Sequence, residues 1–377
     1  MKTETQWKTW FETFHSNTLA GSGNQSWFEC GEKEVTGRVF YRLFAGGDDR
    51  CSLLFGDAMD TTFADGSHSR VNQTLGGWTL RAARIGVTKR AEIDGFDEPE
   101  WMTPLTFDGE PEKHVAPGER FASDPVRLRA EKGDYLCLET TVSGPRVPCH
   151  PETLLPCFVR GEAGWTRSVN TLFAQMIGCD RPVRLRVGYL GDSITQGCGT
   201  RMNRYEHWSA VVSERLGEEC AFWNLGLGYA RAHDAAACGD WLERAKRNDL
   251  VVLCAGVNDL FQRPEPRVED IERSLQTIVA QLRQAGARVL VQTIPPFDYD
   301  EVRRVEWTQI NDWIRGTLSK QADALFDVAP VLRLSAQELW RARYGGHPDG
   351  EGCRRWAEAL EPVLRGLIEK TVEARRG

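Results

Sequence analysis

Four short motifs in the second half of the chain carry residue types that could catalyse acyl transfer. Ser193 offers a hydroxyl that becomes a good nucleophile once a base removes its proton. His347 has an imidazole whose ordinary pKa of about 6.5 suits proton transfer near neutral pH. The backbone N–H of Gly226 and the side-chain amide of Asn258 could stabilise negative charge on an attacked carbonyl oxygen. The motifs are GDSITQG (191–197), NLGLG (224–228), GVND (256–259) and GGHP (345–348).

The sequence around these motifs predicts an α/β unit with a parallel sheet. Five β-rich runs alternate with segments of helical periodicity, as in sheets that carry helices on both faces. The runs are RLRVGYL (184–190), AFWNLGL (221–227), LVVLCAG (250–256), ARVLVQTI (287–294) and ALFDV (324–328). Helices are expected over 207–217, 234–248, 268–286 and 307–322, and from about Gly352 to the end. Ligands bind beyond the carboxyl ends of such strands, where the first three motifs lie.

The first half of the chain predicts a different kind of unit. Short β-rich runs such as VTGRVFYRLF (35–44) and SLLFGDAM (52–59) are separated by turn residues. This pattern is typical of a β-sandwich or jelly roll. Aromatic residues among the first twenty favour a short helix packed on it. We therefore predict an all-β sandwich, jelly-roll-like domain over 1–178 and an α/β catalytic domain over 179–377.

The order Ser, Gly, Asn, His in these motifs resembles the SGNH, or GDSL-type, hydrolase superfamily. The four motifs are similar to its first, second, third and fifth blocks, and the resemblance covers about 185–377. It implies a flavodoxin-like parallel five-stranded sheet with helices on both faces, the SGNH hydrolase fold. The segment VAPGERFASDPVRLRAEKGDYLCLE (115–139) resembles part of the β domain in some two-domain GDSL esterases. That likeness implies a domain that walls the active-site cleft or binds carbohydrate, with a purely structural appendage as the alternative.

The same resemblance implies a serine esterase that works in two steps. Ser193 is the expected nucleophile and His347 the expected base. The expected oxyanion donors are the N–H groups of Ser193 and Gly226 and the Asn258 amide. Each step is acyl transfer, first to Ser193 and then to water. This chemistry needs no metal and no cofactor.

One position departs from the superfamily pattern. An Asp usually stands three residues before the histidine, and here that position is Tyr344. A neutral phenol cannot stabilise an imidazolium as a carboxylate does. The sequence leaves three interpretations: a Ser–His dyad oriented by a backbone carbonyl or another polar group, a carboxylate from elsewhere such as Asp349, or an enzyme that is slow or has lost hydrolysis.

Several further residues are candidates for the substrate pocket. Four of them have an alternative structural role: a surface loop for His150, a helix start for the segment around Tyr205 and His207, and a salt bridge for Arg231. Asp259 is expected to cap or pair locally. The segment PPFDY (295–299) is expected to form a pocket loop. The pocket candidates are Asp192, His150, Tyr205, His207, Arg231 and Tyr344.

The composition of the chain argues against two classes of partner. The net charge is −7 and basic residues are interspersed with acids, which argues against a nucleic-acid partner. No run approaches the ~18 apolar residues of a membrane span, so we expect no membrane partner. The N-terminus has no apolar segment typical of a signal peptide, so a cytoplasmic location is expected. The eleven cysteines form no CxxC pair and are expected to be reduced and buried.

The favoured activity is hydrolysis of small acyl esters, including O-acetyl groups on carbohydrate, and the expected partner is a small-molecule or glycan ester. An acyltransferase would use the same residues, and a carbohydrate-binding protein with a weakened hydrolase core is the third hypothesis. The sequence leaves homo-oligomerisation open. A lipase acting at interfaces is disfavoured because no amphipathic lid segment is evident.

Overall fold

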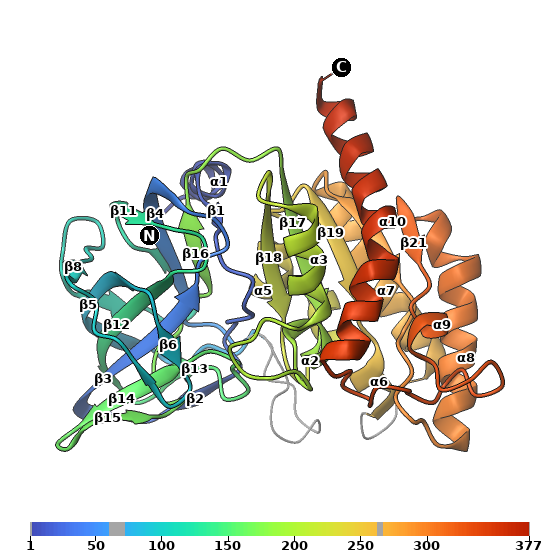
Figure 1. Cartoon of the computed structure of the whole chain (residues 1–377), viewed down its shortest axis with the longest axis horizontal. Helices are drawn as coiled ribbons and strands as arrows, with labels where there is room; N and C mark the ends of the chain where they lie inside the picture. The colour runs from blue at the N-terminus through green and yellow to red at the C-terminus, as the bar shows by residue number, and fades with distance from the viewer. Residues whose placement is uncertain (1, 60–71, 262–266, 377) are drawn as a thin grey trace. The chain divides into compact units, whose positions relative to one another are not determined.

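The structure is a computed structural model that describes residues 2–59, 72–261 and 267–376 (Figure 1). It divides into two compact units, with the division along the chain between Pro182 and Val183. We call these the β unit and the α/β unit and describe each by itself. None of the helices in the described ranges is both long and apolar enough to cross a membrane.

The β unit contains two large antiparallel sheets, as expected for a sandwich. One sheet has the order β1-β16-β4-β10, with β11 also pairing with β4; the other has the order β15-β14-β3-β12-β5-β8, with β9 also pairing with β5. The strands of the first sheet are β1 (His15–Ser16), β4 (Gly47–Gly56), β10 (Arg120–Ala122), β11 (Val126–Ala130) and β16 (Met176–Cys179). Those of the second are β3 (Gly31–Arg42), β5 (Trp78–Thr88), β8 (Thr103–Pro104), β9 (Lys113–Val115), β12 (Tyr135–Gly144), β14 (Cys157–Gly161) and β15 (Gly164–Arg167). Two small pairs join β2 (Ser26–Phe28) to β13 (Val147–Cys149) and β6 (Ala91–Glu92) to β7 (Gly95–Phe96).

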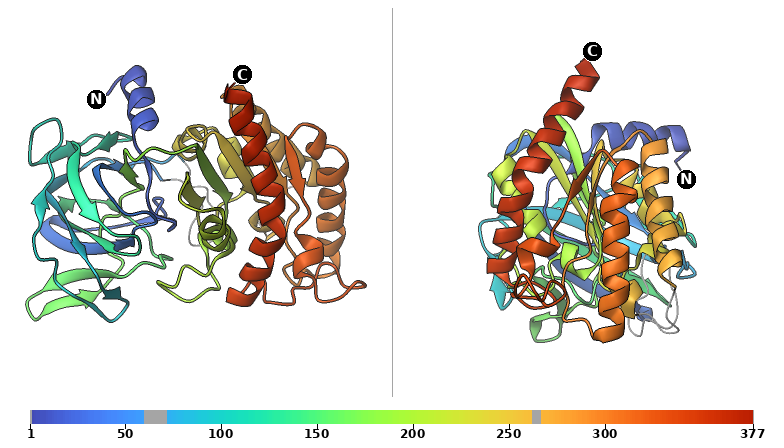
Figure 2. Two further views of the ribbon diagram at one scale, coloured as in Figure 1. Left: turned by 45° about the horizontal axis from the view of Figure 1, so that its top comes forward. Right: turned by 90° about the vertical axis from the view of Figure 1, so that its right-hand side faces the viewer.

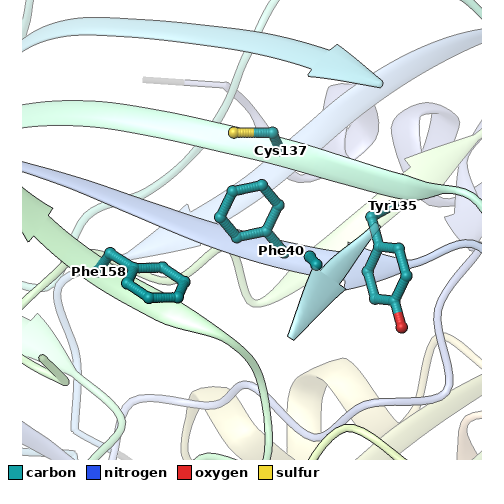
Figure 3. Packing of buried hydrophobic residues seen from close by; sticks show 5 residues of the cluster. Phe40, Tyr135, Cys137 and Phe158 are labelled. Atoms are coloured by element: carbon teal, nitrogen blue, oxygen red, sulfur yellow. The ribbon is translucent and has the colours of Figure 1, made fainter. Parts of the chain in front are cut away.

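Both faces of the seven-stranded sheet are covered. Val39 and Tyr41 are fully buried, and so is Phe40, whose side chain points to the opposite face because strand side chains alternate. Phe40 belongs to a separate apolar cluster with Tyr135, Cys137, Phe158 and Ala91 (Figure 3). We call this the outer cluster.

The helix expected near the N-terminus is present as α1 (Glu4–Thr13). Thr3 caps it, and the Thr3 and Gln6 side chains form a capping box. Trp10 is buried and donates its indole N–H to the Ser52 hydroxyl of β4 at 3.0 Å. The prediction of a helix packed on the β unit is therefore confirmed.

The α/β unit has one parallel sheet in the order β18-β17-β19-β20-β21. This is the flavodoxin-like order, with a change of direction between β17 and β19 where ligands bind in such folds. The strands are β17 (Leu185–Gly191), β18 (Cys220–Gly226), β19 (Leu250–Cys254), β20 (Arg288–Gln292) and β21 (Ala324–Phe326). The predicted fold class, an all-β sandwich followed by an SGNH-type α/β domain, is confirmed.

Helices cover both faces of this sheet, as the right-hand view of Figure 2 shows. They are α2 (Ser193–Gln196), α3 (Trp208–Leu216), α4 (Ala232–Ala236), α5 (Asp240–Ala245), α6 (Val257–Phe261), α7 (Val268–Gln284), α8 (Glu301–Gly316), the 3-10 turn η1 (Leu318–Lys320), α9 (Ala329–Leu332) and α10 (Gly350–Arg376). The helix predicted over 234–248 is two helices, because Cys238 takes a positive φ of 57° and Gly239 caps α5. The one predicted from 307 begins at Glu301, where the Asp300 side chain caps it by accepting the Arg303 N–H.

All eleven cysteines are free thiols. Most are buried, as expected, and Cys238 is the exposed exception. They therefore contribute to the cores as small apolar side chains.

Candidate functional site

Ser193 stands at the junction of β17 and α2. Gly191 ends the strand, and a Cβ added there would lie 2.2 Å from the Thr195 hydroxyl oxygen and 2.3 Å from the Cys254 carbonyl oxygen. Only glycine allows so tight a turn at this point. Asp192 caps the helix by accepting the Ile194 N–H at 2.9 Å. The backbone N–H of Ser193 lies in the first turn of α2, where N–H groups have no acceptor within the helix.

His347 lies in contact with Ser193, although 154 residues separate them in the sequence. The Ser193 Oγ and the His347 Nε2 are 2.8 Å apart, which is hydrogen-bond distance. Burial lowers the pKa of His347, so the neutral imidazole that can accept a proton is favoured near neutral pH. The two predicted reactive side chains are thus adjacent and in the state that proton transfer requires.

Packing positions the imidazole. The ring of Phe297 meets it edge to face, with centroids 5.3 Å apart. Gly199 takes a φ of 94°, and a Cβ added there would lie 2.6 Å from the His347 carbonyl oxygen. The chain therefore approaches the histidine closely at a point where only glycine fits.

Tyr344 stands where the superfamily usually has an Asp, and Asp349 is the candidate replacement carboxylate; both contact α10. A Cβ added at Gly352 would lie 2.6 Å from the Tyr344 Cβ, so Tyr344 packs on the first turn of α10. Asp349 accepts the Gly352 N–H at 2.9 Å and caps the same helix. Burial is the only cause that shifts the pKa of His347, so no carboxylate in the described ranges acts on it appreciably.

The predicted oxyanion donors differ in their availability. The Gly226 N–H donates to the Asn224 side-chain oxygen at 2.8 Å. It is therefore already paired at the end of β18, which argues against the oxyanion role predicted for Gly226. Asn258 donates from Nδ2 to the Ala230 carbonyl at 2.9 Å, and an amide nitrogen carries a second hydrogen.

Two buried acids lie next to these residues in the sequence. Burial, followed by the charge of Asp259, raises the pKa of Asp192 to about 7. Burial also raises the pKa of Asp259 to about 6, although its carboxylate accepts the Ala232 N–H at 2.8 Å and the His233 N–H at 3.2 Å. Asp259 thus holds the start of α4, in line with the local cap expected from the sequence. The influence of Asp259 on Asp192 has no signature in the sequence, because it depends on the strands bringing residues 67 positions apart together.

The remaining pocket candidates have structural partners. His207 caps α3 by accepting the Ala210 N–H at 3.2 Å, and Tyr205 packs near it with ring centroids 6.2 Å apart. Arg231 forms a fully buried ion pair with Asp234 at 2.6 Å. These contacts agree with the structural alternatives for each residue, and a pocket role stays a prediction.

His150 belongs to the β unit. Its side chain is fully buried, and Nδ1 lies 2.5 Å from the Gly23 carbonyl oxygen. Burial lowers its pKa to about 4. The alternative of a surface-loop histidine is therefore wrong, and its predicted place in a substrate pocket stays untested.

An aromatic strip extends from His347 to solvent, and the sequence predicts only part of it. Phe297 contacts His347, and the Phe261 ring lies 5.5 Å from Phe297 and 5.8 Å from Tyr299. Phe261 is 39% exposed. The segment PPFDY predicted as a pocket loop supplies Phe297 and Tyr299, whereas Phe261 comes from α6. Only the fold shows that α6 ends beside that segment.

Comparison with known proteins gives a match for this unit. Residues 189–355 match the GDSL-like lipase/acylhydrolase family. No curated protein matches the sequence significantly.

This chain is similar to solved structures of esterases and lipolytic proteins. A family two carbohydrate esterase from Clostridium thermocellum in complex with cellohexaose has 14% identity and a TM-score of 0.40, with 94% of this chain and 99% of that chain covered. A member of the lipolytic protein G-D-S-L family from Veillonella parvula DSM 2008 has 15% identity and a TM-score of 0.39, with 48% and 98% covered. A carbohydrate esterase family 3 protein from Talaromyces cellulolyticus has 19% identity and a TM-score of 0.38, with 49% and 99% covered.

The family match coincides with the unit that brings Ser193 and His347 together. Residues 189–355 therefore match a GDSL-like lipase/acylhydrolase domain, and this match supports a hydrolase enzyme.

Proposed function

We propose that the protein removes small acyl groups, O-acetyl included, from carbohydrate by serine–histidine acyl-enzyme chemistry. The 2.8 Å contact between the Ser193 Oγ and the His347 Nε2 carries this proposal. A serine is activated when a neutral imidazole takes its proton as the hydroxyl attacks. The buried setting keeps His347 neutral near neutral pH, which fits that task.

The first step forms an acyl-enzyme. The Ser193 oxygen bonds to the ester carbonyl carbon while its proton passes to His347. The developing oxyanion is held by the Ser193 N–H and by the free hydrogen of the Asn258 amide. His347 then returns the proton to the leaving alcohol oxygen as the ester bond breaks. In the second step, water attacks the acyl carbonyl, its proton passes to His347, and Ser193 leaves with that proton.

The protein uses a dyad in this proposal. Tyr344 and Asp349 are engaged at α10, so the imidazole is positioned by packing against Phe297 and beside Gly199. The imidazolium then lacks a carboxylate to stabilise it. A dyad of this kind still benefits from the oxyanion donors, each of which is typically worth about 10²–10³ in rate.

The aromatic strip supports a carbohydrate as the alcohol part of the ester. His347 protonates the leaving oxygen, so the leaving alcohol lies on the side of the histidine where Phe297 and Phe261 follow one another. A pyranose ring presents a flat face of C–H bonds that packs well on aromatic rings. The small acyl group is supported by the enclosure of Ser193, which is only 7% exposed.

A fluorophosphonate probe tests the nucleophile directly. We expect intact-protein mass spectrometry to show one adduct per chain, located on Ser193 and absent from Ser193→Ala. The same two proteins are then assayed for acetate release from acetylated xylan or acetylated glucomannan fragments. Labelling at another residue, or equal acetate release by Ser193→Ala, would contradict the proposal.

A further inference from the structure

The β unit has a groove whose lining residues all belong to that unit. It lies where strands of both sheets end, and Asp48 of β4, Ala130 of β11 and Thr88 of β5 contribute to its walls. The groove encloses about 840 Å³. This volume falls within the roughly 300–1,000 Å³ that small-molecule sites usually occupy.

An exposed indole lines this groove. Trp101 is 63% exposed, the highest value among the large apolar side chains of the described ranges. Among the residues that the structure describes, the Trp101 ring has no aromatic or hydrogen-bond partner. A tryptophan left open to water in a concave site is a common feature of ligand recognition, since its flat face gains contact area at low conformational cost.

The loop that carries Trp101 is fixed firmly. The next residue, Met102, packs on the outer cluster together with Phe96. A Cβ added at Gly86 of β5 would lie 2.5 Å from the Trp101 carbonyl oxygen and 2.6 Å from the Met102 sulfur. The exposed indole is therefore presented by a packed backbone, which reduces the ordering cost of binding.

Most of the acids along the groove are held in ion pairs. All but one of the acids that line the groove have a basic partner within 3.0 Å. The pairs are Asp48 with Arg127, Asp97 with Arg90, Glu98 with Arg38, and both Glu131 and Asp134 with Lys89. Glu100 has no ion-pair partner in the described ranges. The walls thus offer fixed hydrogen-bond donors and acceptors side by side.

We propose that this groove is a second binding site, which takes a neutral oligosaccharide with the apolar face of one sugar ring on Trp101. Sugar hydroxyls both donate and accept hydrogen bonds, so they can use the carboxylates and the cations of the paired walls. The C–H face of the ring covers the indole. The site binds without chemistry, and its function does not depend on Ser193.

The test measures binding by the full chain in a Ser193→Ala background, so that no ester is turned over. Cellotriose, xylotriose and maltotriose are titrated by calorimetry, with saturation-transfer NMR to show which sugar protons contact the protein. We expect at least one of them to bind, and Trp101→Ala to weaken that binding about tenfold or more. Trp101→Phe keeps a flat face and should weaken it less.

Two control variants distinguish binding in the groove from non-specific binding and from a loss of folding. Ile93→Ala changes another exposed apolar side chain of the β unit outside the groove and should leave binding unchanged. In the Ser193-containing chain, Trp101→Ala should leave thermal unfolding and hydrolysis of a small soluble ester unchanged. Binding that Trp101→Ala does not alter, or no binding of any neutral sugar, overturns the proposal. Choline that binds more tightly than every sugar, and is lost with Trp101→Ala, assigns the groove to cations and also overturns it.

Discussion

Ser193 and His347 touch each other but are held in different ways. The serine follows a strand directly, and hydrogen bonds fix its surroundings: Asp192 caps α2, and the Asn224 side chain donates to the Thr195 carbonyl at 3.1 Å. The histidine lies between α9 and α10, outside any helix or strand. Its position depends on the Phe297 ring and on the absence of a side chain at Gly199. Hydrogen bonds therefore position Ser193, whereas packing positions His347.

The largest expected effect tests whether Ser193 and His347 act as one unit. Ser193→Ala and His347→Gln should each lower kcat by about 10³-fold or more, and the double variant should be no slower than the slower single one. Steady-state kinetics on a short-chain aryl ester measures this. Effects that multiply in the double variant would show that the residues contribute independently.

The next prediction concerns the buried acid on the serine side. The pKa of Asp192 is raised to about 7, so between about pH 4 and pH 7 the folded state binds its proton more tightly than the unfolded state does. Stability is therefore lost as the pH rises through this window, by up to about 4 kcal/mol. Asp192→Asn removes this loss and keeps an oxygen for the Ile194 N–H. Urea unfolding should show it more stable than the wild type at pH 8, with a smaller difference at pH 5.

Asp349→Asn is the matched control on the histidine side, because it also caps a helix but from an exposed position. Its stability difference from the wild type should hardly change between pH 5 and pH 8. If the stability differences of both variants depended equally on pH, the contrast would fail between the buried acid next to Ser193 and the exposed acid near His347.

A smaller effect is expected from crowding the base. Gly199→Ala places a methyl group 2.6 Å from the His347 carbonyl oxygen and should lower kcat about 10- to 100-fold by shifting the imidazole. Gly217→Ala is the control: its φ of 87° is similarly positive, but a Cβ there meets nothing within 4 Å. If both variants lose the same activity, backbone strain and not displacement of His347 is responsible.

The smallest effect is expected at Tyr344. Within the described part of the chain its phenol makes no hydrogen bond to His347, so Tyr344→Phe should keep kcat within about twofold. Because burial lowers the pKa of His347, the acidic limb of kcat/KM should lie below pH 6.5 in both proteins. A loss of tenfold or more would show that the phenol orients the imidazole.

The fold could be predicted from the sequence further than the site. The parallel sheet follows from the alternation of β-rich and helical segments, and the location of Ser193 and Asn258 follows from strand ends. The partner of the Gly226 N–H could not be predicted from the sequence. The Asn224 side chain is oriented by its contacts with α2, and these form only when α2 lies over β18. The aromatic strip was also beyond prediction, since Phe261 and Phe297 come from segments that only the tertiary fold brings together.

The short helix α6 has a consequence for how the protein tolerates change. Its adjacent residues Asn258 and Asp259 reach the same stretch of chain: one bonds the Ala230 carbonyl and the other the Ala232 and His233 N–H groups. A substitution at either position removes one attachment and leaves the other. Inserting or deleting one residue just before Asn258 turns both side chains by about 100° around the helix axis and detaches both at once. This point of the chain is therefore expected to tolerate exchange of residues better than a change of length.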